Sequence, residues 1–255
     1  MIRTDGLALV TGASRGLGAA LVAALLGRGA RHVIGVARTT RDAVTAPWAR
    51  DPRYRHVACD LGAADARTAL AAAVAELPGT PLLVIHNAAA VRSDLRPGGA
   101  IDFEAWDEVT ATAIHGLGHV LRATQPHLLK HGGALVGISS FAALAPPVAD
   151  PRVAYPAAKA HLDAALRSLR LAWRGRVDVV TVHLGHIGGA DDGWRGRLIR
   201  PSYAAAAAYV VRALEARRAP ERIGYTWPYR LVFRHVLPVV PDALYARAVR
   251  AILRR

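Results

Sequence analysis

The stretch Thr11-Gly12-Ala13-Ser14-Arg15-Gly16-Leu17-Gly18 decides the fold, because it joins an apolar run at 7–11 to a helical pattern at 16–28. Glycines at this spacing let the backbone turn sharply and approach a pyrophosphate. The free N–H groups at the start of the following helix stabilise the negative charge of that group. A glycine-rich turn between a strand and a helix also occurs for steric reasons alone, so this segment by itself only favours dinucleotide binding.

Short apolar runs alternate with longer helical patterns along the chain. The runs cover 7–11, 32–37, 54–58, 82–86, 134–139 and 177–183, and the helical patterns cover 16–28, 63–76, 104–130, 154–173 and 202–217. Such alternation is typical of a parallel sheet whose strands are buried on both faces. The sequence therefore predicts an α/β fold in one domain, 1–255, with a Rossmann-like, doubly wound parallel sheet of six strands in a three-layer α/β/α arrangement.

Composition excludes several classes of protein. The chain has 255 residues, of which 53% are hydrophobic and 20% charged, so it can bury a full core and is not a disordered tail. No apolar segment reaches the length needed to cross a bilayer. The single cysteine, Cys59, cannot form an internal disulfide, and the first residues lead into a strand pattern rather than a secretory segment. We expect a cytoplasmic protein.

Basic residues are abundant and almost all of them are arginines. The formal net charge is +14, with 33 Lys and Arg together, of which only Lys130 and Lys159 are lysines. The arginines are spread along the chain rather than gathered in one block, as a general compositional bias would produce, so we expect no nucleic-acid partner. Each lysine is a candidate for a place that requires an ammonium group rather than a guanidinium group.

The end of the second predicted strand indicates which dinucleotide binds. An acid there would accept hydrogen bonds from a ribose 2′-OH, but the sequence is Val36-Ala37-Arg38. Arg38, together with Arg15 from the glycine-rich turn, can hold a 2′-phosphate through charge-assisted hydrogen bonds. The sequence therefore favours NADP(H) over NAD(H). The alternative explanation is that, in a chain so rich in arginine, the two arginines stand at these positions by chance.

Two further motifs lie downstream, Ser139-Ser140-Phe141 after the fifth predicted strand and Tyr155-Pro156-Ala157-Ala158-Lys159 at the start of a helical pattern. Residues 155 and 159 lie one helical turn apart on the same face. Together with the glycine-rich turn and with Asn87-Ala88-Ala89 after the fourth predicted strand, these motifs resemble the short-chain dehydrogenase/reductase family over about residues 5–190. The resemblance implies an NADPH-dependent carbonyl reductase or alcohol dehydrogenase acting on a small, fairly apolar ketone or aldehyde.

The resemblance assigns catalytic roles to three residues. Tyr155 is the general acid/base that protonates the carbonyl oxygen as hydride arrives from the nicotinamide. An unperturbed phenol has a pKa near 10, and the ammonium group of Lys159 lowers it while also binding the nicotinamide ribose. Ser140 positions the substrate carbonyl, with Ser139 as the alternative if the alignment is displaced by one residue.

The resemblance also implies the contacts with the cofactor. They involve the glycine-rich turn, the end of the second strand, the residues after the third and fourth strands, and the exit from the sixth strand. In chain order they are Gly12, Ser14, Arg15, Gly16, Leu17, Gly18, Arg38, Asp60, Leu61, Asn87, Tyr155, Lys159, Gly185 and Ile187. Two of them also have a local explanation, since an Asp after a strand often caps a helix and an Asn before small residues often forms a turn.

The chain departs from the family pattern at three places. The family asparagine that completes the proton relay falls at Ala113, and His115 lies about 200° further around an α-helix, so it is no simple replacement. Ala89 stands in place of a glycine, and Leu184-Gly185 in place of Pro-Gly. These departures keep an alternative open, in which the chain is an NADP-binding sensor or scaffold with little turnover.

Several segments carry weaker predictions. A proline-rich insertion at 145–151 could cover the pocket, and 188–201, with Trp194, corresponds to the substrate loop of the family. His183 and His186 flank the end of the sixth strand, where a substrate could touch them. The pairs His115/His119 and His127/His131 have ligand spacing without a third ligand, so no metal site is expected.

The C-terminal extension, at about 222–255, ends in an amphipathic helical pattern over 242–255 with arginines on its polar side. Such a helix could contact an anionic membrane surface. Packing over the pocket or against another subunit is the preferred interpretation, because any surface helix turns an apolar half toward the core. The family resemblance implies a homodimer or homotetramer.

Overall fold

The computed structural model describes residues 1–145, 152–188, 200–216, 221–223 and 232–253. Its centre is a seven-stranded sheet in the order β3-β2-β1-β4-β5-β6-β7, with every neighbouring pair parallel. The strands are β1 (Leu7–Thr11), β2 (His32–Ala37), β3 (Tyr54–Ala58), β4 (Leu82–His86), β5 (Gly133–Ser140), β6 (Asp178–Leu184) and β7 (Glu221–Ile223). The order reverses between β1 and β4, which confirms the doubly wound Rossmann-like fold.

The number of strands was predicted wrongly. The first six strands lie within a residue of their predicted positions, but the sequence analysis missed β7, which pairs with β6 through Thr181↔Glu221 to His183↔Ile223. The strand has only three residues, Glu-Arg-Ile, at the edge of the sheet. A short edge strand of this kind has no apolar run from which it could be recognised.

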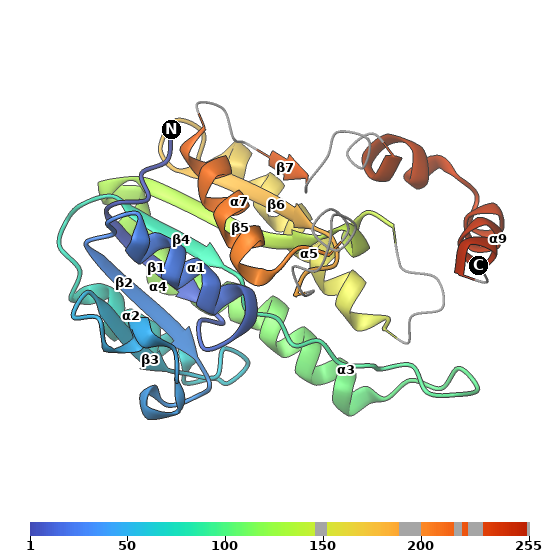
Figure 1. Cartoon of the computed structure of the whole chain (residues 1–255), viewed down its shortest axis with the longest axis horizontal. Coiled ribbons are helices and arrows are strands. Elements are labelled where there is room, and N and C mark those ends of the chain that lie inside the picture. Colours follow the sequence, from blue (N-terminus) through green and yellow to red (C-terminus); the bar gives the residue numbers. More distant parts are fainter. Residues whose placement is uncertain (146–151, 189–199, 217–220, 224–231, 254–255) are drawn as a thin grey trace.

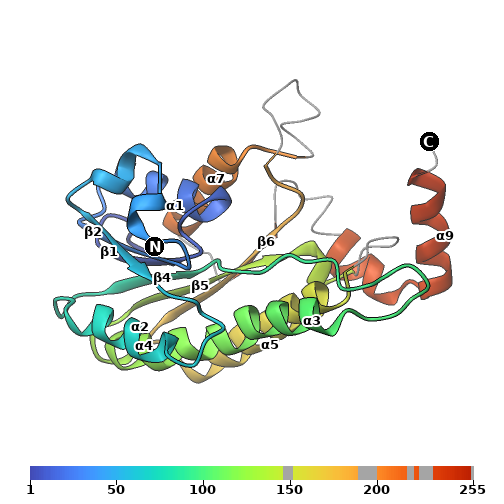
Figure 2. The ribbon, with the colours of Figure 1, turned by 90° about the horizontal axis from the view of Figure 1, so that it is seen from below.

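Helices cover both faces of the sheet, and Figure 2 shows the three layers edge-on. One face carries α1 (Gly16–Gly27) and α7 (Tyr203–Glu215), and the other carries α2 (Ala66–Ala75), α4 (Gly116–His131) and α5 (Ala154–Ala172). Single turns of 3-10 helix lie at Arg41–Ala43, Pro47–Arg50, Phe141–Ala143 and Leu237–Val239. The three-layer α/β/α prediction is confirmed.

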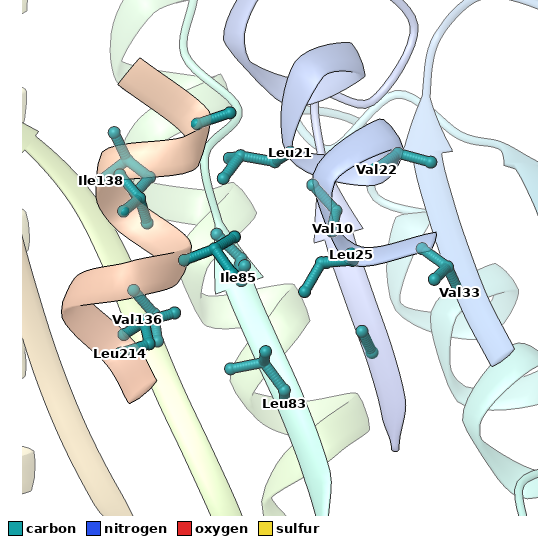
Figure 3. Packing of buried hydrophobic residues seen from close by; sticks show 14 of the residues in the cluster. Val10, Leu21, Val22, Leu25, Val33, Leu83, Ile85, Val136, Ile138 and Leu214 are labelled. Atoms are coloured by element: carbon teal, nitrogen blue, oxygen red, sulfur yellow. The ribbon is translucent and has the colours of Figure 1, made fainter. Parts of the chain in front are cut away.

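An apolar core fills the space between the sheet and the α1/α7 layer. Figure 3 shows Leu21 and Leu25 of α1 and Leu214 of α7 packed over strand residues such as Ile85 and Val136. All five side chains are completely or almost completely buried. Burial of this apolar surface is the main force that holds α1, and with it the glycine-rich turn, against the ends of the strands.

The predicted helix at 104–130 is interrupted. It consists of α3 (Phe103–Thr110), one π-helical turn (Ala111–His115) and α4, so the interpretation as one regular helix was wrong. A π-helical turn inserts one residue per turn and is often found at functional sites. The interruption includes Ala113, the position that the family resemblance assigns to the relay asparagine.

The C-terminal part ends in a second π-helical segment (Val232–Val236) and α9 (Asp242–Leu253). In both Figure 1 and Figure 2, α9 stands apart from the sheet. Within the described ranges, the structure contains no helix with the length and hydropathy that a bilayer span requires. Most of the predicted substrate loop, including Trp194, and residues 146–151 of the predicted insertion lie outside the described residues.

Candidate active site

A cleft of about 1080 Å³ opens at the carboxyl ends of the central strands. This is the edge of a doubly wound sheet where ligands bind. The structure brings every predicted cofactor-binding and catalytic residue to this cleft, from the glycine-rich turn at one end to the residues after β6 at the other. The lining contains Gly12, Ser14, Arg15, Gly16, Leu17, Gly18, Arg38, Asp60, Leu61, Asn87, Ser140, Tyr155, Lys159, Gly185 and Ile187.

The glycine-rich turn has the backbone that a phosphate site requires. Gly12 and Gly16 have φ angles of 68° and 58°, in the left-handed region that favours glycine. A Cβ atom on Gly18 would overlap the carbonyl oxygen of Gly12. Helix α1 starts without a side-chain cap and without an acid in its first turn, so its N–H groups are available to an anion. These residues fit the pyrophosphate of a dinucleotide.

Asn87 joins the end of β4 to the end of β1. Its side-chain amide donates to the carbonyl oxygen of Thr11 at 3.0 Å, and its backbone N–H donates to the Thr11 hydroxyl at 3.0 Å. The same hydroxyl accepts a hydrogen bond from the N–H of Ala88, also at 3.0 Å. These bonds hold together the two strand ends between which the cleft opens.

Tyr155, Lys159 and Ser140 come from two neighbouring elements. Tyr155 and Lys159 lie in the first turns of α5, with the Lys159 Nζ 5.7 Å from the centre of the Tyr155 ring. Ser140 ends β5, and its Oγ accepts a hydrogen bond from the N–H of Ala142 at 3.1 Å. Ser139, in contrast, is a buried residue whose Oγ has no partner in the described part of the chain. Both serines line the cleft, and of the two only the Oγ of Ser140 has a hydrogen-bond partner among the described residues.

The ammonium group of Lys159 is buried beneath the cleft. Its Nζ donates to the carbonyl oxygen of Ile138 at 2.7 Å, which fixes its position against β5. Burial lowers the pKa of Lys159 to about 8, and the carboxylate of Asp163 acts in the opposite direction. The lysine is thus cationic at neutral pH and loses its proton not far above it.

Comparison with known proteins identifies the family. The family described as short chain dehydrogenase matches residues 6–191. The chain belongs to the short-chain dehydrogenase family. It is 32% identical over 210 residues, 78% of each chain, to D-threitol dehydrogenase of Mycolicibacterium smegmatis. It is 34% identical over 168 residues, 63% of each chain, to a probable galactose dehydrogenase of Rhizobium meliloti.

One solved structure of the family can be aligned with nearly the whole chain. The short chain dehydrogenase of Burkholderia cenocepacia in complex with NADP is 28% identical, with a TM-score of 0.76, and the alignment covers 96% of this chain and 98% of that one. This short-chain dehydrogenase is thus an NAD(P)-dependent oxidoreductase that acts on CH–OH or C=O groups.

Ala113, the position that the family resemblance assigns to the relay asparagine, lies in a small apolar cluster. Ala113 is buried in the π-helical turn among Ala154 and Ala158 of α5, and Tyr155 packs against the same cluster. His115 is exposed, in agreement with the helix geometry expected from the sequence. The described structure therefore offers no side chain from position 113 to continue a proton relay.

His86 is a buried group that the sequence analysis missed. It ends β4, and its Nδ1 lies 3.3 Å from the Oγ1 of Thr11. Burial and the charge of Lys159 lower the pKa of His86 to about 3, while a hydrogen bond with the backbone of Ala113 acts in the opposite direction. A neutral imidazole thus connects the π-helical turn to β1. Its position directly before Asn87 was the only signal in the sequence.

An ion-pair network at the mouth of the cleft was also missed. Glu108 of α3 accepts from Arg38 at 3.1 Å and from Arg92 at 2.7 Å. Both arginines and Glu108 line the cleft. Arg38 is therefore where the 2′-phosphate prediction needs it, but a carboxylate already engages it. Nothing in the local sequence pattern indicates that α3 would approach the end of β2.

Two weaker predictions have different outcomes. Asp60 lines the cleft, and it also accepts a hydrogen bond from the N–H of Gly62 at 2.9 Å. This bond belongs to a turn and not to a helix cap, because α2 begins only at Ala66 with Asp65 as its N-cap residue. His183 and His186 do not belong to the described lining of the cleft. His183 is hydrogen-bonded to Asp163 of α5. The hypothesis of a substrate contact through these histidines finds no support in the described lining.

The histidine pairs on α4 have other partners. His119 Nδ1 lies 3.2 Å from the carbonyl oxygen of Leu61, and His127 Nε2 lies 2.8 Å from that of Thr80. Among the described residues, no three His, Cys, Asp or Glu side chains are arranged to bind a metal ion.

Proposed function

We propose that this enzyme is an NADPH-dependent carbonyl reductase that acts on a small and fairly apolar ketone or aldehyde. In the opposite direction it acts as an alcohol dehydrogenase. One observation carries the proposal. Ser140, Tyr155 and Lys159 line the same cleft as the glycine-rich turn, so groups suited to proton transfer face a site suited to a dinucleotide. A scaffold that only bound the cofactor would have no use for this combination.

The residues act on the two ends of the carbonyl bond. When bound, NADPH supplies a hydride to the carbonyl carbon. Tyr155 donates its phenolic proton to the carbonyl oxygen, and Ser140 holds that oxygen by a hydrogen bond. The ammonium group of Lys159 favours the phenolate that remains and binds the nicotinamide ribose. In the direction of oxidation the phenolate accepts the alcohol proton.

Preference for NADPH is supported by charge at the end of β2. Ala37 stands where an acid would bind a ribose 2′-OH, and the side chains of Arg38 and Arg15 line this part of the cleft. Arg92 adds a third cation next to Glu108. Glu108 and Asp60 are the two acids in the described lining, and against the three guanidinium groups they still leave a net positive charge for the 2′-phosphate.

The apolar substrate is supported by the lining near Ser140. Leu184 is the register partner of Ser140 on β6, and Ile138 lies two residues before it on β5. Ala90 packs in the cluster that includes Tyr155. The described side chains around the catalytic groups thus offer few hydrogen bonds to a hydroxyl-rich substrate.

A second candidate is oxidation of a small polyol or sugar. It is favoured by the relatives, which are named D-threitol dehydrogenase and probable galactose dehydrogenase. The two candidates use the same catalytic residues and differ only in the groups that surround the reacting carbon.

A substrate panel tests the proposal. Purified protein is mixed with NADPH and ketones, aldehydes or diketones, and with NADP⁺ and D-threitol or D-galactose, while the absorbance of the reduced cofactor is followed. The proposal expects consumption of NADPH with an apolar carbonyl and a much slower rate for Tyr155→Phe. Cofactor binding without turnover on any compound would instead support the sensor or scaffold alternative.

We also infer a homodimer or homotetramer built on the long helices. Leu171 of α5 and Phe103 of α3 are large apolar side chains that are 72% and 69% exposed. The two side chains lie at different ends of these helices, and each offers apolar surface that a second subunit would cover. Light scattering should give a multiple of 27.0 kDa for the native chain and a smaller mass for Leu171→Glu.

A further inference from the structure

Helix α5 carries three polar residues in one stripe. Tyr155, Lys159 and Asp163 are spaced four residues apart, so each lies one turn above the previous one on the same side of the helix. The first two face the cleft and belong to the proposed catalytic machinery. Asp163 lies one turn further from the cleft and has no role in the reaction as described so far.

Asp163 is held by a histidine from the sheet. The Oδ2 of Asp163 lies 2.5 Å from the Nε2 of His183, and the side chains are 20% and 1% exposed. Because an ionised carboxylate only accepts hydrogen bonds, Nε2 of His183 carries the proton and donates it. His183 lies on β6, next to Ser139 in the register, so the pair joins α5 to the two strands behind the cleft.

Lys159 needs a negative charge nearby. Its ammonium group is buried, and a buried cation is costly unless a partner compensates it. The neighbours that face it are the phenol of Tyr155, the neutral imidazole of His86 on β4 and the carboxylate of Asp163. Of these groups, only Asp163 supplies a full negative charge at neutral pH. Arg167, one turn beyond Asp163 along α5, is exposed, and the imidazole of His183 is the group that holds Asp163.

The cluster is poorly optimised for stability. Three buried polar atoms in it, Oγ of Ser139, Oδ1 of Asp163 and Nδ1 of His183, have no hydrogen-bond partner among the described residues. Each such atom costs free energy of folding. Apolar residues at these positions would pack between α5 and the sheet without that cost, so a contribution to folding alone does not account for the pair.

We propose that Asp163, held in place by His183, is a positioning residue that keeps the ammonium group of Lys159 charged beneath Tyr155. The inference rests on the proposed function, in which a cationic lysine supports proton transfer by the tyrosine. It adds to that function two residues that do not line the cleft and touch neither substrate nor cofactor.

The decisive experiment compares pH profiles of the intact chain. Asp163→Asn removes the charge but keeps the shape and a hydrogen-bonding oxygen. In the carbonyl assay its alkaline decline in kcat should begin at lower pH than that of the native enzyme. The matched control, Asp178→Asn, removes one exposed acid at the start of β6 and should leave the profile unchanged. Asp163→Glu, which restores the charge, should move the decline back toward the native position.

A second readout separates this inference from the proposed function. The affinity for NADPH is measured by fluorescence across the same pH range, and Asp163→Asn should lose affinity at lower pH than the native chain. If the native protein binds NADPH but reduces no carbonyl, the proposed function fails and this binding profile still decides the inference. If the native enzyme turns over and both profiles of Asp163→Asn match the native ones, the inference fails alone.

Circular dichroism shows whether each variant folds. If Asp163→Asn does not, His183→Gln replaces it, because it keeps the carboxylate of Asp163 but removes the imidazole that holds it. The inference expects an alkaline decline at lower pH for His183→Gln than for the native enzyme. A folded His183→Gln variant with native pH profiles for both kcat and NADPH affinity would overturn it.

Discussion

The two faces of the central sheet differ in what they bury. The fully buried strand residues that face α1 and α7 are hydrophobic, as Val10, Ile85 and Val136 illustrate. The strand residues that are buried and polar point to the face covered by α2, α4 and α5. Because alternate residues of a strand face opposite sides, Thr11, His86, Ser139, Thr181 and His183 all share this face.

The two faces of the sheet therefore contribute differently, one to stability and the other to the chemistry of the cleft. The apolar face fixes the glycine-rich turn through dispersion and burial, which have no directional requirement. The other face holds Lys159 and the groups around it in a medium of low polarity, where charges interact strongly and shift each other's pKa values. Changes on the first face should alter stability, and changes on the second should alter chemistry.

The largest effect is expected from Tyr155→Phe. Loss of the phenolic hydroxyl removes the proton donor, so kcat for carbonyl reduction should fall by a factor of about 10²–10⁴. The midpoint of thermal unfolding and the affinity for NADPH should change little, because the ring remains. A variant that consumes NADPH at the native rate would contradict the assignment of the acid.

Leu25→Ala tests the apolar face. Leu25 is completely buried between α1 and the sheet. Its truncation should lower the free energy of unfolding by about 2–5 kcal/mol, measured by denaturant titration. The pH profile of the folded variant should remain native. A displaced profile would show that the two faces are not independent.

The native pH profile tests the polar face directly. Because burial lowers the pKa of Lys159 to about 8, the lysine is charged below this pH and neutral above it. Activity should therefore decline as the pH rises through about 8, in contrast to the higher pH expected for a lysine in water. Initial rates at saturating NADPH measure the decline, and constant activity up to pH values near 10 would exclude a role for the lysine charge.

Arg38→Ala should have the smallest effect. It removes an exposed cation that Glu108 already engages, so the affinity for NADPH should weaken by about tenfold with little change for NADH. Glu108→Gln is the matched opposite change, since it frees Arg38 and should strengthen NADPH binding. Fluorescence titrations with both cofactors measure the ratio. Equal losses for NADPH and NADH would contradict a role in 2′-phosphate binding.

Sequence reasoning was most successful where a pattern is local. The alternation of apolar runs and helical patterns located six strands, and the motifs around Gly12, Asn87 and Tyr155 located the cleft. It failed at β7, whose three residues carry no apolar pattern, and at the π-helical turn, because a one-residue insertion does not change the helical character of the sequence.

By itself, the sequence determined the family, the order of the elements and the motif side chains that reach the cleft, because strand and helix periodicity and short motifs depend on neighbours along the chain. Only the tertiary structure decided that Glu108 engages Arg38, that His86 reaches the π-helical turn and that His183 meets Asp163 instead of the cleft. These contacts join residues from different elements, and their energies depend on burial and distance. Neither quantity exists until the helices have packed on the sheet.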